Sequence, residues 1–231
     1  YPGYFISEGG GGKALGMGGA FVAVADDSSA VGWNPAGLTN LRTGEIAFLH
    51  SILLSGTKSE FVSAALPLGS FGTLGAGFFQ LGSGSAVRYD ASGSDNGTFT
   101  GSQSAIFGSL GYNLIGAEEE GQPMLSAGHT AKIVMESFDS AAVSGFGLDT
   151  GVIFRPVDFI SAGLNAQNLL APRLAWKTET EKFPLEIKYG AAAKFLDNDL
   201  TVGFQGESAA GGSRFRFGAS YRYDIAEARA G

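Results

Sequence analysis

Apolar and polar residues alternate with a period of two along the C-terminal half of the chain. In residues 146–155, Phe146, Leu148 and Val152 fall on one face, and Asp149 and Arg155 fall on the other. Because successive side chains of a β-strand point to opposite faces, this pattern predicts strands that separate two different environments. The same alternation covers residues 160–167, 186–195, 200–207 and 214–223.

The N-terminal half contains further strand-like segments with a less regular pattern. We expect strands near residues 44–53, 59–67, 71–81, 102–113 and 124–136, which brings the total to about ten. The second and third of these do not separate their faces cleanly. Either they contact another part of the chain, or the register assumed for them is wrong by one residue.

The links between the predicted strands differ in length. The links at residues 68–70, 156–158 and 197–198 are tight, and those at 82–101 and 168–185, which follow strands of the opposite parity, are long. A membrane barrel has short periplasmic turns and longer outer loops, so this alternation favours an antiparallel transmembrane β-barrel. The link at 114–123, with Glu118, Glu119 and Glu120, is an exception because it is long although it lies on the side where tight turns are expected.

Residues 9–41, GGGGKALGMGGAFVAVADDSSAVGWNPAGLTNL, differ from the strand segments. They hold too much glycine for one long helix and too much small apolar surface for a solvated linker. We expect a short helix at residues 30–33, capped by residues 26–29 and ended by Pro35. The sequence therefore predicts an N-terminal plug of short helices, residues 1–42, called the hatch below, followed by barrel strands in residues 43–231.

Residues 14–38, ALGMGGAFVAVADDSSAVGWNPAGL, resemble a segment near the N-terminus of the PorV/PorQ branch of the FadL-like outer-membrane β-barrels. Residues 165–169, NAQNL, resemble a strand-end motif of the same family. The resemblance implies a bacterial outer-membrane barrel with a hatch folded inside it. The hatch positions that carry the motif are Gly16, Gly18, Gly19, Trp33, Asn34, Pro35 and Ala36.

Charged residues occupy the polar faces of the clearest strands. They are expected to line the lumen of a barrel, where neighbours on adjacent strands would also pair. These residues are Asp149, Arg155, Lys188, Lys194, Glu207, Arg214, Arg216 and Arg222.

Composition narrows the classes of function. The 231 residues include 37 glycines, 18 phenylalanines and no cysteine, with a net charge of −7. The absence of a Lys/Arg cluster argues against a nucleic-acid partner, and no stretch approaches the roughly 18 apolar residues of a membrane-spanning helix. A membrane would therefore be crossed by strands.

Motifs for catalysis and metal binding are weak. Residues 9–13 resemble a phosphate-binding loop, but Ala14 stands where Ser or Thr is needed. His50 and His129 each stand alone on a predicted strand, and the loop with Asp90 and Asp95 lacks the spacing of a calcium-binding EF-hand. We expect a protein that is not an enzyme and has no catalytic residue, metal site or cofactor.

Two functions are compatible with the resemblance. A PorV-like protein would bind secreted cargo or a protein partner at the cell surface, as in type IX secretion, whereas a FadL-like protein would be a channel for hydrophobic small molecules. The PorV-like role is favoured here because the hatch motif matches that branch more closely and the inferred lumen is charged. A soluble β-sandwich binding protein is the structural alternative.

The last clear strand, residues 214–223, is followed by a segment that reads as the opening of another strand. A closed barrel leaves no strand edge, and the resemblance to the FadL-like family implies a barrel of more than ten strands. We therefore expect an incomplete barrel, or one whose edges a partner chain covers by strand addition. Outer-membrane lipid and a protein partner or secreted cargo are the expected partners.

Overall fold

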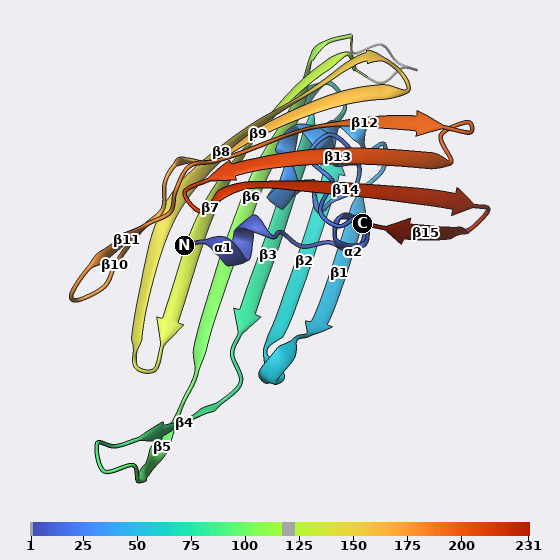
Figure 1. Ribbon diagram of the computed structural model, residues 1–231. Helices are drawn as coiled ribbons and strands as arrows, with labels where there is room; N and C mark the ends of the chain where they lie inside the picture. The colour runs from blue at the N-terminus through green and yellow to red at the C-terminus, as the bar shows by residue number, and fades with distance from the viewer. Residues whose placement is uncertain (1, 117–122) are drawn as a thin grey trace.

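The computed structural model describes residues 2–116 and 123–231, and eleven of its strands form one antiparallel sheet. This confirms the predicted all-β fold. The sheet curls so that β12–β14 cross in front of β1–β3, and the hatch lies between them (Figure 1). In spatial order the strands are β1 (Glu45–Ile52), β2 (Lys58–Pro67), β3 (Thr73–Gly82), β6 (Gly101–Ile115), β7 (Leu125–Phe138), β8 (Ala141–Val157), β9 (Ile160–Leu170), β12 (Glu186–Phe195), β13 (Leu200–Ala209), β14 (Gly212–Tyr223) and β15 (Ala226–Ala230).

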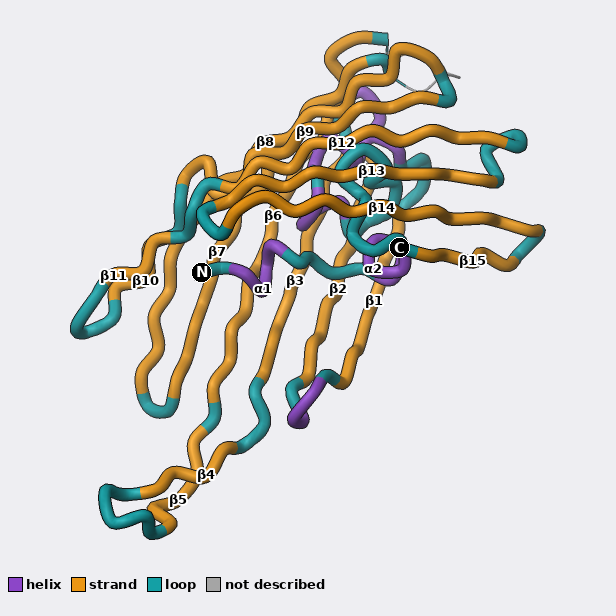
Figure 2. The backbone as a smooth tube through the Cα atoms, in the orientation of Figure 1, coloured by secondary structure: helices purple, strands orange, loops and turns teal. Residues whose placement is uncertain are grey.

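All ten predicted strands are present within a few residues of their expected bounds, and β15 adds an eleventh after the last of them. The two links predicted as long loops each contain a small hairpin that projects from the sheet (Figure 2). One hairpin is β4 (Ala86–Tyr89) with β5 (Asp95–Phe99), and the other is β10 (Arg173–Ala175) with β11 (Thr180–Lys182).

The predicted alternation of link lengths is only partly right. The links β7–β8 and β13–β14, at residues 139–140 and 210–211, are tight although they lie on the side where long loops were expected. Two-residue links are a common way to join antiparallel strands, so parity alone does not fix loop length. Glu118, Glu119 and Glu120 lie outside the described residues.

The sheet is open over residues 2–116 and 123–231, since β1 pairs only with β2 and β15 only with β14. An incomplete barrel or completion by a partner strand therefore stays a prediction. The described part of the chain holds no helix long and apolar enough to cross a membrane.

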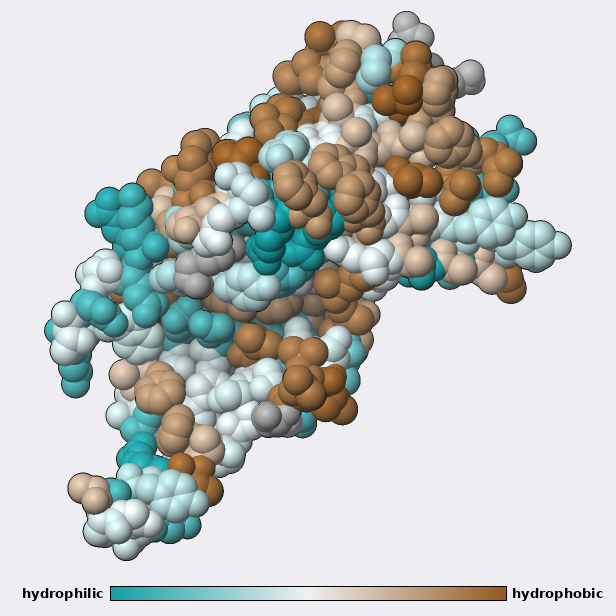
Figure 3. Space-filling view, in the orientation of Figure 1, coloured by the Kyte–Doolittle hydropathy of each residue, from teal (hydrophilic) through white to brown (hydrophobic). Residues whose placement is uncertain are grey.

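The two faces of the sheet differ in polarity. In the space-filling view, hydrophobic side chains lie over β8, β9 and β12, and hydrophilic ones gather beside α1 (Figure 3). An apolar outer face with a polar inner face is the pattern of a barrel in lipid. The exposed outward side chains include Ile46, Phe48, Val62, Leu66, Leu74, Ile106, Leu110, Ile133, Phe146, Leu148, Phe154 and Phe217.

The irregular patterns of β2 and β3 have a structural cause. Both strands turn large apolar side chains inward, and Phe61 and Phe79 are buried with their rings 6.2 Å apart. Phe61 lies directly against the backbone of Gly10 in the hatch. Contact with the hatch, and not an error of register, therefore explains why the inner faces of these strands are apolar.

The hatch consists of α1 (Tyr4–Ser7), α2 (Gly12–Gly16), α3 (Ala30–Trp33) and a 3₁₀-helix, η1 (Pro35–Asn40). The predicted helix at residues 30–33 is present, but its predicted cap differs in detail. The Ser29 side chain makes no capping bond; instead, Asp27 Oδ1 accepts the Ser29 N–H at 2.9 Å. An aspartate that bonds a backbone amide two residues on stabilises a turn, so Asp27 fixes the entry to α3.

Glycines on the inner face of the sheet let the hatch backbone approach it. Gly111, Gly128 and Gly151 lie directly opposite one another on β6, β7 and β8. A Cβ atom at Gly128 would overlap the backbone of Pro35, and one at Gly151 would overlap the Asn34 side chain. Three adjacent strands therefore share one row without side chains, and the hatch occupies the space.

Candidate functional site

Trp33 anchors the hatch. Its side chain is fully buried, its Nε1 donates to the Gly10 carbonyl at 2.8 Å, and its ring meets Phe21 edge-on at a centroid distance of 6.0 Å. The Lys188 ammonium of β12 lies 4.9 Å from the Trp33 ring centre, in the range of a cation–π contact. The anchor therefore joins two hatch segments to each other and to the sheet.

Asn34 and Pro35 follow the anchor and set the direction of η1. Asn34 Nδ2 donates to the carbonyls of Val22 in the hatch and Val152 in β8, at 2.8 and 3.2 Å. Asn34 Oδ1 accepts the Ala36 N–H at 3.2 Å, which caps η1, and Pro35 occupies the first turn, where no N–H is needed. One amide side chain thus satisfies groups on both the hatch and the sheet.

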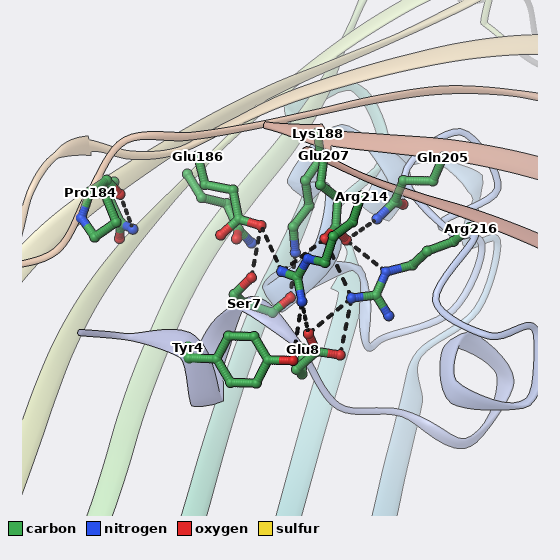
Figure 4. Close-up of polar contacts among 12 residues, drawn as sticks. Tyr4, Ser7, Glu8, Pro184, Glu186, Lys188, Gln205, Glu207, Arg214 and Arg216 are labelled. Carbon is green, nitrogen blue, oxygen red and sulfur yellow. Dashed lines mark hydrogen bonds and ion pairs between the residues drawn. The ribbon is translucent and has the colours of Figure 1, made fainter. Parts of the chain in front are cut away.

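The N-terminal helix α1 docks through a cluster of buried and half-buried polar residues (Figure 4). Ser7 Oγ donates to Glu186 Oε1 at 2.7 Å, and Lys188 Nζ donates to the Ser7 carbonyl at 2.5 Å. Arg214 NH1 donates to Glu8 Oε1 at 2.7 Å. We call the set the Glu8 network; its members are Ser7, Glu8, Glu186, Lys188, Gln205, Glu207, Arg214 and Arg216.

The Glu8 network is balanced in charge, with three carboxylates and three cationic side chains. Arg216 NH2 donates to both Glu8 oxygens at 2.9 and 3.0 Å, and Arg216 Nε lies 3.0 Å from Glu207 Oε1. Burial raises the pKa of Glu8, but hydrogen bonds and the charges of Arg216 and Arg214 outweigh burial, so the net pKa is below its ordinary value. The helix is therefore held with Glu8 ionised.

A cavity of about 610 Å³ lies between α1 and the inner face of the sheet. Most of its wall is apolar or aromatic, as in sites for small organic ligands. Carboxylates and small polar groups complete the wall. It is lined by residues from the hatch, from β1, β2, β3, β6 and β7, from the β1–β2 link and from β11, including Tyr4, Phe5, Glu8, Leu15, Leu53, Phe79, Leu81, Gln103, Glu136 and Glu181.

A second cavity, of about 560 Å³, adjoins the first on the side of the β4–β5 hairpin. The two cavities share Leu81, Gln103 and Glu136 in their walls. The second is lined also by Phe99, Phe138 and Trp176. Apolar space therefore extends from the projecting hairpin to α1.

The predicted lumen charges fall into separate groups. Lys188, Glu207, Arg214 and Arg216 belong to the Glu8 network. Arg222 differs, because its side chain is exposed beside Asp199, at 3.6 Å, and does not reach that network. It shares the strand face of Arg214 and Arg216, but lies near the end of β14.

The other three lumen positions lie away from α1. Asp149 is buried and accepts two hydrogen bonds from Lys132 Nζ, at 2.7 and 2.9 Å. Arg155 NH2 donates to Asn40 Oδ1 of the hatch at 2.6 Å. Lys194 is half-buried and lines a narrow gap together with Arg155.

The motif glycines of the hatch lie against the C-terminal strands. Gly16 packs on Arg229, Gly18 on the backbone of Gly231, and Gly19 on Arg216 and Trp33. Gly18 and Gly19 have φ values of 60° and 78°, which residues other than glycine rarely adopt. Backbone shape therefore fixes this part of the motif.

Several site residues were not predicted from the sequence. Lys132 and Glu136 both sit at inward positions of β7, and their alternation with the neighbouring residues is a usable signal. Glu8 and Glu181 carry no comparable signal, since their neighbours in space come from distant parts of the chain. Their role emerges only from the fold.

The chain was compared with family sequence models, curated proteins and solved structures, and the solved structures show a similar fold. The sequence model of a family described as "Uncharacterised protein family (UPF0164)" matches residues 5–103. No curated protein matches the chain. Among solved structures, the toluene transporter TbuX of Ralstonia pickettii is similar with a TM-score of 0.65 and 16% identity, over 94% of this chain and 84% of that one.

Two further structures agree. The toluene transporter TodX of Pseudomonas putida has a TM-score of 0.61 and 12% identity, over 94% of this chain and 81% of that one. A FadL homologue of Pseudomonas aeruginosa has a TM-score of 0.58 and 10% identity, over 93% and 76%. At such low identity the likeness concerns the fold, and it does not single out the PorV branch. The chain therefore has a fold similar to that of these FadL-like β-barrels, with its sheet open over the described residues.

Proposed function

We propose that this protein is a bacterial outer-membrane channel that takes up hydrophobic small molecules. The observation that carries the proposal is the largely apolar 610 Å³ cavity between α1 and the sheet. Its size lies within the range of pockets that hold small organic ligands. The two toluene transporters of similar fold support an apolar cargo.

The path is proposed to run through the two adjoining cavities. A ligand would enter beside the β4–β5 hairpin and pass Leu81 to reach α1. The hatch blocks the way further inward, because α3 and η1 are buried against the sheet. Passage would therefore require movement of the hatch, with Trp33 and the Glu8 network as its attachments.

Transport can be tested in bacteria that make the full chain. Uptake of toluene or butylbenzene by these cells should be faster than by cells without the protein, and bulky apolar competitors should slow it. Cell fractionation and heat-modifiable gel mobility test the membrane location. A water-soluble protein with no effect on uptake would contradict the proposal.

A protein-binding role in secretion, the PorV-like function, is the second candidate. The feature that favours it is the β4–β5 hairpin, which projects beyond the end of the sheet (Figure 2). Val87 and Tyr89 of this hairpin are exposed, and an exposed aromatic side chain is suitable for contact with a protein. A native pull-down that recovers a partner, and loses it when the hairpin is shortened, would support this role over uptake.

A further inference from the structure

The charges that line the inner cavity are all negative. Glu8, Glu136 and Glu181 contribute to its wall, and no lysine or arginine of the described residues does. A site for a fatty acid or another anion would instead be expected to offer cationic donors to the carboxylate. The charges of the cavity wall therefore indicate the charge of the ligand, in addition to its apolar character.

Glu8 is already neutralised by its surroundings. It accepts hydrogen bonds from Arg214 and Arg216, and the Glu8 network contains equal numbers of acidic and basic side chains. The charges that remain for a ligand are those of Glu136 and Glu181. Glu136 is buried, and its hydrogen-bond donor is the neutral Gln103 amide, at 3.1 Å. Over residues 2–116 and 123–231, neither glutamate forms an ion pair within 4 Å.

The β10–β11 hairpin turns its acidic residue inward and its cationic residues outward. Glu181 lies opposite Leu174, whose side chain is fully buried, and opposite residues of antiparallel strands share a face. Lys182 lies opposite Arg173, and both are exposed on the other face. The hairpin therefore presents Glu181 to the cavity without a balancing cation.

Two carboxylates that face one partly desolvated space repel each other and favour a positive charge between them. A bound ammonium group would offset that repulsion, whereas a bound carboxylate would add to it. The rings of Phe5 and Phe79, 5.8 Å apart, offer apolar surface for the body of the ligand. We propose, on the basis of the uptake function above, that the cavity binds hydrophobic molecules that carry a protonated amine.

Three ligands with the same apolar body test this proposal. The full chain in neutral detergent would be titrated at pH 7 by calorimetry with 4-phenylbutylamine, 4-phenylbutyrate and butylbenzene. The amine should bind at least tenfold more tightly than the carboxylate, a difference of about 1.4 kcal/mol. The double variant Glu136→Gln/Glu181→Gln should lose most of this preference and still bind butylbenzene. Glu60→Gln, on the outward face beside His50, is the matched control and should keep the preference.

The outcomes separate the two proposals. If phenylbutyrate binds as tightly as the amine while butylbenzene also binds, the amine class is wrong and the uptake proposal stands. If none of the three binds, both proposals are wrong. If the double variant keeps the preference, the assignment to Glu136 and Glu181 is wrong. If the double variant binds none of the three ligands, the amine class is judged from the unaltered protein alone, by whether it binds 4-phenylbutylamine more tightly than 4-phenylbutyrate.

Discussion

Replacement of Trp33 by alanine should release the hatch while the strands stay assembled. Trp33 is fully buried, and truncation of a buried Phe or Trp to alanine costs about 3–5 kcal/mol. The Gly10 carbonyl would also lose its donor and Lys188 its aromatic partner. These losses are included in that range, since contributions at one site are not additive. The outward apolar faces of the strands are unchanged.

A cost of about 3–5 kcal/mol increases the open fraction of the hatch by a factor of a hundred or more. Lys13, in α2, provides a site at which to measure this opening, because its side chain is mostly covered and bonded to Asp26 at 2.9 Å. Trypsin cleavage at Lys13 should rise by a comparable factor while opening is fast relative to cleavage. Channel conductance or antibiotic sensitivity of cells should rise as well.

Trp176→Ala is the matched control, because Trp176 lies in the β10–β11 link and outside the hatch. It should leave cleavage at Lys13 unchanged. Unaltered cleavage and permeability in Trp33→Ala would refute the view that Trp33 holds the hatch, and something else would then close the barrel.

Three other predictions concern the hatch and its packing against the sheet. Gly128→Ala should cost about 1–3 kcal/mol in chemical unfolding because the added methyl group overlaps Pro35, whereas Gly108→Ala, on the outward side, should have little effect. Asn34→Ala should speed hydrogen exchange in the hatch, because the Val22 and Val152 carbonyls lose their donor, at a cost of about 1–3 kcal/mol. The pKa of Glu8 is lowered on folding, so its contribution is present above its ordinary pKa of 4.5 and is lost as pH falls through the lower folded value. Hatch opening, read at pH 3–7 with an acid-tolerant protease, should therefore increase toward acid, and Glu8→Gln should remove most of that dependence.

The strands could be predicted from the sequence because each carries its own pattern. The alternation of Phe215 and Phe217 with Arg214 and Arg216, for example, predicts both the strand and the direction of its side chains. The helix at residues 30–33 was predictable for the same reason, since its signals lie next to it in the chain. Local order thus accounts for most of the elements.

The parts that were missed depend on distant contacts or on weak patterns. The docking of α1 joins Ser7 to Glu186, 179 residues away, and no spacing rule predicts such a pair. The β4–β5 hairpin is rich in Gly and Ser and mostly exposed, so its strands show no alternation.

The separation between α1 and its partners also affects how the chain folds. During synthesis, Arg214 and Arg216 emerge 206 and 208 residues after Glu8. Contacts between such distant segments slow folding, because a long loop must close before they form. Until β14 is in place, Glu8 lacks the two arginines that bind it. The kinetics of assembly, and not only the final stability, are thus tied to β14, which makes a chaperone that delays collapse valuable to this architecture.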